Sequence, residues 1–315
     1  MKKDISSTNS LLQSKQPKNV LKEYGRYLIQ IRKIQRYYRL YLKRKKGILK
    51  ERFIDNKSNI NSGIQIQSKE YSDGSKYTGT LINDKREGYG VQVWPDNSTY
   101  EGEWVNDKAC GKGKFTSERG DVYEGEWYDD AANGRGIFRK TDGAYYDGEW
   151  KNDVQNGFGI EVAADGSRYE GQFLNGQKSG NGKFVWADGT SYEGNWENSA
   201  LQGEGTYRWN DGRVYSGHWK EGCMDGKGTY TWPNGKKYVG DYFNDKKQGK
   251  GVFIWPDGRK YDGEWKNGKQ DGVGRYKGLD GITRVGNWVN GKRVKWTGIV
   301  NDNGTITPIT EEDKE

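Results

Sequence analysis

The sequence predicts an all-β repeat protein: an elongated single-layer antiparallel sheet of β-hairpins, preceded by one basic amphipathic α-helix. Three observations support this fold class. The 315 residues include 47 glycines, 22 tyrosines and 13 tryptophans against 31% apolar residues, whereas average glycine usage is about 7%. Tyrosines recur every 23 residues from residue 77 onwards, and basic residues concentrate before the repeats begin. Such periodicity is typical of a solenoid whose units bury their apolar faces against their neighbours.

Composition and the start of the sequence exclude several classes of protein. The mean hydropathy is −1.13, and no apolar run approaches the roughly 20 residues that cross a bilayer. Lys2 follows Met1, so neither a secretory signal nor a myristoylated glycine is expected. Cys110 and Cys223 are too few for a disulfide framework and lack metal-ligand spacing. We therefore expect a soluble cytoplasmic protein with reduced, structural thiols.

Charge is unevenly divided along the chain. Residues 1–69 hold 18 basic and 4 acidic side chains, a net charge of +14. Residues 70–315 hold 34 basic and 40 acidic side chains, a net charge of −6. The two regions are therefore expected to have different partners.

The basic region is predicted to contain a flexible tail at residues 1–19, an amphipathic helix at residues 20–53 and a linker at residues 54–62. Apolar side chains recur at spacings of three or four residues, the period of one helix face, and basic side chains occupy the other faces. The periodic part, from Val20 to about Lys46, is about 40 Å long at 1.5 Å per residue. Its apolar stripe consists of Tyr24, Tyr27, Leu28, Ile31, Ile34, Tyr38, Tyr41 and Leu42.

Five residues of this segment have a spacing similar to an IQ motif, with leucine where that motif usually has glycine. Calmodulin and related EF-hand light chains bind IQ helices, so the resemblance implies such a light chain as a partner. An apolar stripe can enter a methionine-lined groove while arginines meet acidic lobes. Alternatively, the helix packs across the repeat sheet, docks on a larger assembly, or lies on a membrane or an acidic polymer such as tubulin or RNA. The light-chain-binding residues would be Ile34, Gln35, Arg39, Leu40 and Arg44.

Residues 63–293 are predicted to form the repeat array, with a half-unit, nine 23-residue repeats from Tyr77 and a partial tenth. A glycine follows each repeat tyrosine by two residues, and a large apolar residue follows it by four. Alternation with a period of two places tyrosine, glycine and tryptophan on one face of a strand. The structural aromatics predicted on that face include Tyr100, Trp104, Tyr123, Trp127, Tyr146, Trp150, Tyr192, Trp196, Tyr215, Trp219, Tyr261 and Trp265.

Each repeat is expected to be a hairpin whose glycines leave gaps that aromatic rings of neighbouring strands fill. In the second strand of one repeat, Gly226, Gly228, Tyr230 and Trp232 are predicted to share a face. The loop between the strands, such as residues 267–271, is expected to be solvated. An Asp-Gly turn is predicted to join one hairpin to the next.

The array is predicted to end in a capping hairpin at residues 294–310 and an acidic tail at residues 311–315. Two strand-like stretches flank a polar turn at residues 301–304. Pro308 and the acidic tail would discourage further pairing at this edge.

The unit Tyr261-Asp-Gly-Glu-Trp-Lys-Asn-Gly268-Lys-Gln-Asp-Gly272-Val-Gly274 resembles a MORN repeat, and the resemblance covers about residues 63–291. Arg284 replaces the opening tyrosine of the last unit. Repeats two to four also lack a late tryptophan that other units have, and those positions hold Ser117, Lys140 and Ala163.

The resemblance implies a binding scaffold. Among MORN proteins, those of cilia and flagella, including radial-spoke heads, and of other cytoskeletal structures fit best. We therefore expect structural proteins of a large assembly, and further copies of this chain, as partners in an axoneme, and no nucleic acid. The family is also linked to anionic phospholipid, which makes a peripheral membrane tether the alternative. The net charge of the repeats argues against a negative membrane.

The sequence offers no catalytic, metal or cofactor site. His218 takes the place where other repeats have an acidic residue, and Glu103, Glu126 and Glu149 form a regular ladder in which no pair stands out as acid and base. We expect all four to be solvated. The Asp-Gly turns lack the further ligands of a calcium loop, and no phosphate-binding fingerprint occurs. The chain is therefore predicted not to be an enzyme.

Overall fold

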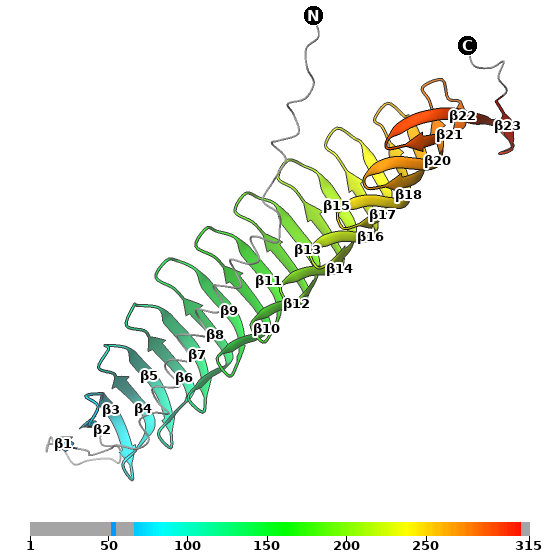
Figure 1. Ribbon diagram of the computed structural model, residues 1–315. Helices are drawn as coiled ribbons and strands as arrows, with labels where there is room; N and C mark the ends of the chain where they lie inside the picture. The colour runs from blue at the N-terminus through cyan, green and yellow to red at the C-terminus, as the bar shows by residue number, and fades with distance from the viewer. Residues whose placement is uncertain (1–51, 55–65, 310–315) are drawn as a thin grey trace, which may run out of the picture. The chain divides into compact units, whose positions relative to one another are not determined.

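The computed structural model describes residues 52–54 and 66–309, which form 23 β-strands of one antiparallel sheet (Figure 1). The chain divides into two units, one ending at Gly180 and the other beginning at Asn181, inside strand β12 (Gln177–Val185). The tail, the IQ-like motif and most of the predicted helix lie outside the described residues. The all-β class and the antiparallel pairing predicted from the sequence are confirmed.

The N-terminal edge of the sheet differs from the prediction. β1 (Arg52–Ile54) is a strand, although the sequence predicts helix as far as residue 53. It pairs antiparallel with β2 (Ile66–Glu70), which pairs in turn with β3 (Lys76–Ile82). Backbone groups on the outer side of β2 need hydrogen-bond partners, and β1 provides them.

Each repeat contributes a seven-residue strand that starts one residue before its tyrosine, and then a nine-residue strand. In the first unit, consecutive strands pair as hairpins in chain order: β4 (Lys85–Val93), β5 (Thr99–Val105), β6 (Lys108–Thr116), β7 (Val122–Tyr128), β8 (Ala131–Arg139), β9 (Tyr145–Lys151), β10 (Val154–Val162) and β11 (Arg168–Leu174).

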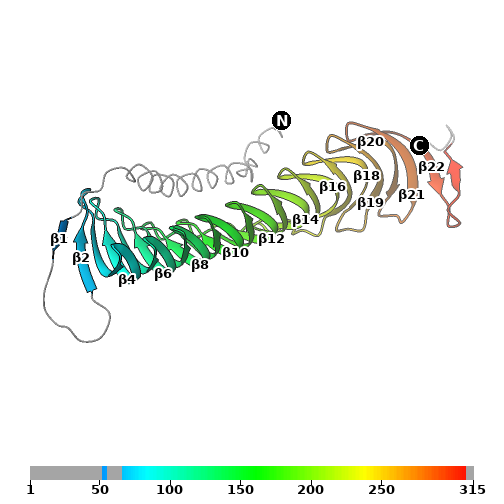
Figure 2. The same cartoon turned by 90° about the horizontal axis from the view of Figure 1, so that it is seen from below.

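The second unit repeats this arrangement, and Figure 2 shows its strands β19 to β21 bent into arcs. Its strands are β13 (Ser191–Glu197), β14 (Ala200–Arg208), β15 (Val214–Lys220), β16 (Cys223–Thr231), β17 (Lys237–Phe243), β18 (Lys246–Ile254), β19 (Lys260–Lys266), β20 (Lys269–Lys277), β21 (Thr283–Val289), β22 (Lys292–Val300) and β23 (Ile306–Pro308).

Two-residue turns close the hairpins and tie each repeat to the one before it. Asp129 and Asp130 have φ angles of 54° and 64°, the left-handed conformation of a hairpin turn that matches strand twist. The Asp130 N–H donates to the Ala109 carbonyl (3.1 Å), and the Ala109 N–H donates to Asp130 Oδ1 (2.7 Å). The same two bonds join Asp153 to Ala132, at 3.0 and 2.6 Å. Neighbouring hairpins are therefore held at their turns as well as by strand pairing.

The loop predicted at residues 267–271 is wrong in extent. Only Asn267 and Gly268, with φ angles of 51° and 83°, form the turn, and β20 begins at Lys269. A two-residue turn suffices because both positions adopt positive φ.

The predicted face of the second strand is also wrong in part. Gly226 has a φ of 93°, and the β15–β16 register shifts between Gly217 and Trp219, so Gly226 lies in a bulge. Bulges use the left-handed region, which glycine enters without steric cost. Trp232 follows β16 and opens the next turn, where its N–H donates to the Lys236 carbonyl (2.9 Å).

The core is a line of rings that we call the tyrosine row: the repeat tyrosines and the large apolar residue four positions after each. Tyr100 is 1% exposed, and its hydroxyl donates to the Glu103 carbonyl (3.0 Å). Its ring lies edge-on to Trp104 and, in the next repeat, Trp127, with centroids 4.8 and 5.1 Å away. Because each tyrosine contacts rings of two repeats, burial is continuous along each unit.

The glycines of the strands make room for these rings. A Cβ on Gly102 would lie 2.7 Å from the Tyr100 hydroxyl oxygen, and a Cβ on Gly113 of the next strand only 2.3 Å from it. Each tyrosine ring thus covers a glycine of its own strand as well as the neighbouring-strand glycine that the sequence predicts. Both positions exclude any larger residue at this backbone spacing.

The C-terminal end contains both strands of the tenth hairpin. β22 starts at Lys292, two residues before the predicted cap, and pairs with β21. β23 then pairs with β22, with Pro308 opposite Gly298. The segment predicted as a separate cap is therefore partly the closing strand of the last repeat, because the 23-residue register extends to it.

Candidate interaction surfaces

A second line of rings runs beside the tyrosine row in the second unit. We call it the second row: the residues 15 and 17 positions after each repeat tyrosine. Trp186 packs between Phe184 and Tyr207, with centroids 4.6 and 5.3 Å away. Trp209 packs between Tyr207 and Tyr230 at 4.5 and 5.2 Å. A late tryptophan thus joins the rings of successive repeats into one stack.

In the first unit the second row is interrupted. Trp94 contacts Phe115 with centroids 6.1 Å apart, but the next three late-tryptophan positions hold other residues. A small hollow on this face is lined by Trp94, Phe115 and the small side chain of Ala109, among others. The three replacements, Ser117, Lys140 and Ala163, are half-buried.

The interrupted row ends at a buried polar cluster that sequence reasoning missed. Glu161 and Lys178 are 2% and 1% exposed and form an ion pair. Lys178 Nζ also lies 5.0 Å from the centroid of the Tyr169 ring. Gln155 lies on the same strand as Glu161, β10, and is 3% exposed. Burial of charge requires such pairing. The only sequence signal was Glu161 itself, at a position where most other repeats have an aromatic residue.

Lys247 occupies a box of four rings in the second unit. Its Nζ lies 5.2, 5.0, 4.7 and 4.8 Å from the centroids of Trp232, Tyr238, Phe253 and Trp265. Burial lowers the pKa of Lys247 to about 8. Ring faces attract the ammonium group, but they do not replace its hydration completely.

The stability of the protein should therefore rise with pH between about 8 and 10. In this interval the folded chain releases the Lys247 proton, whereas the unfolded chain retains it up to the ordinary value of 10.5. Above pH 10 stability should fall, because burial raises the pKa of Tyr77 and Tyr261 to about 12 and the unfolded tyrosines ionise at 10.0. Urea unfolding of the parent and Lys247→Met at several pH values measures this. A rise of equal size in both proteins would contradict the assignment to Lys247.

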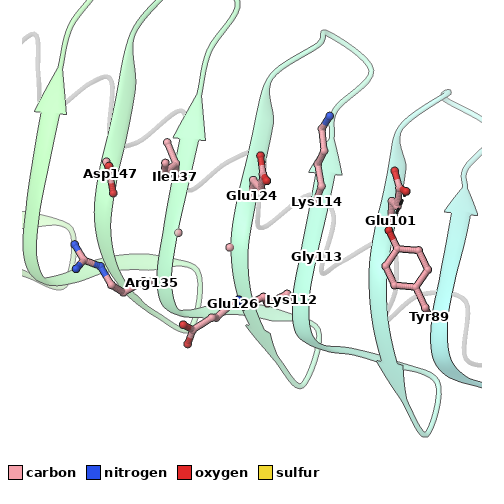
Figure 3. Close-up of a pocket in the computed structure, with 12 residues that line it drawn as sticks. Tyr89, Glu101, Lys112, Gly113, Lys114, Glu124, Glu126, Arg135, Ile137 and Asp147 are labelled. Carbon is pink, nitrogen blue, oxygen red and sulfur yellow. Dashed lines mark hydrogen bonds between the residues drawn. The ribbon is translucent and has the colours of Figure 1, made fainter.

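In the first unit, part of the opposite face of the sheet carries exposed charges in alternation. Lys114 stands between Glu101 and Glu124 in the strand register, and Figure 3 shows the three side by side along a shallow hollow. The Tyr89 hydroxyl donates to Glu101 Oε1 (2.9 Å). Because acidic and basic groups alternate, this part of the face offers no patch of one sign to a phosphate or a metal. No group of three metal-ligating side chains occurs in the part of the chain that the structure describes.

The carboxylate ladder is exposed, and it also supports the bulges. Glu103 Oε1 accepts the Lys112 N–H (3.1 Å), and Glu149 Oε1 accepts the Phe158 N–H (3.3 Å). The Glu126 carboxylate lies against Gly134, where a Cβ would be 2.0 Å from Oε2. His218 is exposed, with Nδ1 3.2 Å from the Asp225 carbonyl oxygen. The expectation that these groups are only solvated is therefore incomplete, because the carboxylates of Glu103 and Glu149 accept backbone N–H groups at their bulges.

The predicted site residues fall into two groups. Ile34, Gln35, Arg39, Leu40 and Arg44 lie outside the described residues. The structural aromatics all belong to the tyrosine row. Eleven of the twelve are buried, and Trp127 is half-buried. Within residues 52–54 and 66–309, no helix is long and apolar enough to span a membrane.

Comparison with solved structures finds distant likenesses. The TCP10 domain of Danio rerio CPAP, in complex with a peptide of Danio rerio STIL, is 13% identical, with 74% of this chain and 99% of that chain covered and a TM-score of 0.40. The SAS-4 (dCPAP) TCP domain of Drosophila Melanogaster is 16% identical, with 56% and 90% covered and a TM-score of 0.30. A virginiamycin B lyase from Staphylococcus aureus is 14% identical, with 84% and 90% covered and a TM-score of 0.15. TM-scores this low support no functional argument.

No curated protein matches the sequence. The comparison with protein families, however, matches the MORN repeat at residues 77–99, 100–122, 123–145, 146–168, 169–191, 192–212, 215–237, 238–258 and 261–283. These nine repeats cover more than half of the chain. The family points to a protein-interaction or membrane-binding scaffold and is generally non-enzymatic. From the 23-residue register, the hairpins and this match, the chain belongs to the MORN-repeat family.

Proposed function

We propose that this chain is a structural scaffold of a cytoskeletal assembly, of the type that MORN proteins form in ciliary axonemes and radial spokes. The observation that carries the proposal is the difference in side chains between the two faces of the sheet. Aromatic side chains contact one another in the tyrosine row, whereas the opposite face of the first unit presents exposed charged side chains such as Glu101, Lys114 and Glu124. An exposed sheet face with charges of both signs suits the binding of extended protein partners.

Proximity labelling in ciliated cells tests the assembly. With the labelling enzyme fused to the C-terminus, axonemal and radial-spoke proteins should be enriched over a cytosolic control fusion. Enrichment of proteins from a different cytoskeletal structure would replace the ciliary assignment. Labelling no different from the control would contradict the scaffold.

The IQ-like segment is proposed to bind a calmodulin-like light chain. Ile34 would anchor in the apolar groove, Gln35 would bond to backbone of the light chain, and Arg39 and Arg44 would meet its acidic lobes. Ile34→Asp should weaken binding by several kcal/mol, because it places a charge in an apolar pocket. Calorimetric titration of the full chain and of peptide 20–50 with calmodulin, with and without calcium, measures this.

Changes at the rim of this interface provide the matched control. Replacing Lys45 and Lys46 by alanine should cost less and act mainly at low salt, since exposed charges are screened over about 8–10 Å. Affinity weaker than about 100 μM for the peptide in both calcium conditions would rule out the light chain. Docking of the segment on another component of the assembly would then be preferred.

A peripheral membrane tether is the second candidate, favoured by the charge of +14 on residues 1–69. Basic segments of this kind bind anionic lipid surfaces. The full chain should then sediment with phosphatidylserine vesicles at low salt and stay in the supernatant at about 0.5 M salt. Added salt weakens the attraction because it shortens the Debye length, from about 10 Å at 0.1 M to about 3 Å at 1 M. Absence of the chain from the vesicle pellet at low salt would exclude the tether.

A further inference from the structure

The interruption of the second row defines a surface on the first unit. In the second unit, each late tryptophan stands between two rings at centroid distances of 4.4 to 6.0 Å. Between Phe115 and Phe138 the corresponding residue is Ser117, and beyond Phe138 it is Lys140. We call Phe115, Ser117, Phe138, Lys140 and Ala163 the interrupted face.

The same face is also thinned at a second position of the repeat. Nine residues after the repeat tyrosine, Arg86 donates to Gln92 (3.1 Å) and Lys247 lies 4.7 Å from the Phe253 ring, so side chains at this position touch the second row. In the second and third repeats this position holds alanine, at Ala109 and Ala132. The hollow lined by Ala109 lies there. The interrupted face thus lacks bulk at two positions in successive repeats.

Unpartnered polar atoms lie at the far end of this face. Glu161 and Gln155 occupy, one repeat further on, the positions of Phe138 and Ala132. Glu161 Oε1 and both amide atoms of Gln155 are buried and have no hydrogen-bond partner among the described residues. Buried oxygens of this kind require a donor, and a carboxylate favours a cationic one. The face therefore fits an occupant that is apolar along its length and basic at one end.

A segment of this chain has that chemistry and the right length. Residues 20–46 combine an apolar stripe with basic side chains, and they precede β1 by only five residues. As a helix they would extend about 40 Å at 1.5 Å per residue. From β2, on which β1 pairs, to β10, which carries Glu161, there are eight strand steps of about 4.8 Å, or about 38 Å.

The periods also match. Tyr24, Ile31 and Tyr38 follow one another at seven residues, about 10.5 Å along a helix. Successive repeats are two strands apart, about 9.6 Å. One apolar side chain of each heptad can therefore meet one repeat of the interrupted face. Arg26 lies about 30 Å along such a helix from residue 46. The five residues that join residue 46 to β1 can span the remaining distance of about 8 Å, so that Arg26 reaches Glu161.

We propose that residues 20–46 dock as an amphipathic helix along the interrupted face, with the apolar stripe over Phe115 to Ala163 and Arg26 at the Glu161–Gln155 end. The late tryptophans are absent from these repeats because the helix takes their place. The docked helix covers its own apolar stripe, including Ile34. A light chain that binds the IQ-like motif must therefore displace it, so docking and light-chain binding exclude each other.

Hydrogen–deuterium exchange of the full chain tests the docking. Amides of residues 24–42 should exchange at least about tenfold more slowly in the full chain than in free peptide 20–50, since a docked helix opens less often. The variant Ser117→Trp, Lys140→Trp and Ala163→Trp adds the residue that the second unit has at the same positions. It should return residues 24–42 to the exchange of the peptide while β5 to β10 stay protected. Lys114→Trp, on the opposite face, is the matched control and should leave the protection unchanged.

A variant outside the sheet keeps the test decisive if the three tryptophans disturb the strands. Ile31→Asp cannot unfold the hairpins, and it should abolish the extra protection of residues 24–42. Glu161→Gln should reduce it chiefly near Arg26. Equal exchange of this segment in the parent chain and the peptide would overturn the proposal. Protection that survives both the tryptophan and the Ile31→Asp variants would do the same. Calmodulin titration is independent of these outcomes, so loss of the light-chain proposal leaves the docking intact.

Discussion

Replacing Trp219 by alanine should lower the free energy of unfolding of the second unit by about 3–5 kcal/mol, the range for a buried tryptophan. The side chain is 2% exposed, and its ring lies 5.1 Å from Tyr215 and 5.6 Å from Tyr192 of the preceding repeat. Its Nε1 donates to the Gly205 carbonyl (3.2 Å). The change therefore removes ring contacts in two repeats and one hydrogen bond. Urea unfolding followed by circular dichroism measures the loss.

Lys220 is the matched control for this experiment. It follows Trp219 in β15 but points to the exposed side of the strand. Lys220→Ala should change the free energy of unfolding by no more than about 0.5 kcal/mol. Equally small effects of the two substitutions would show that the tyrosine row contributes little to stability.

Lys178→Leu should lower the free energy of unfolding of the first unit by about 3–5 kcal/mol, because it leaves the Glu161 carboxylate buried without its ion-pair partner. Leucine itself fits this position, since Leu201 occupies the equivalent place one repeat later and is fully buried. The cost thus arises from the uncompensated charge and not from the shape of the new side chain. Urea unfolding of the full chain, followed by a spectroscopic signal that comes from the first unit, measures the loss of free energy of unfolding.

A double variant separates charge from packing. Glu161→Phe together with Lys178→Leu installs residues that other repeats use at these positions, as at Phe138 and Leu201. Replacing a buried ion pair by apolar residues is often neutral or stabilising by about 1–4 kcal/mol. The double variant should therefore recover the stability lost in Lys178→Leu. A double variant as unstable as the single one would contradict this account.

The buried ion pair is a feature that the repeat sequence alone does not predict. Glu161 was visible as an acidic residue at a mostly aromatic position, whereas Lys178 stands at a variable one. Their pairing depends on strands that lie side by side. Residues 17 apart meet only because the bulges and the two-residue turns set the register. The same holds for the carboxylate of Asp130, which accepts the N–H of Ala109 21 residues earlier. Turn composition predicts a turn but not the bond across the repeat boundary.

For the candidate surfaces, too, the sequence shows one part and only the structure shows the other. The absence of late tryptophans at Ser117, Lys140 and Ala163 is evident in the sequence. That these positions form one continuous face follows only from the stacking seen around Trp186 and Trp209 in the second unit. The box around Lys247 had no sequence signal beyond a lysine at an otherwise variable position, because its four rings come from three strands and one turn.

The sequence by itself determined the class, the 23-residue unit and the buried face of the first strand, because alternation along a strand is a local property that a single chain displays. It also identified the tyrosine row from Tyr77 to Tyr261. The tertiary structure alone decided which glycine forms a bulge, where the turn at Asn267 ends, and which polar side chains are buried together. These features depend on backbone angles and on contacts between neighbouring hairpins, and residue spacing along one strand does not specify them.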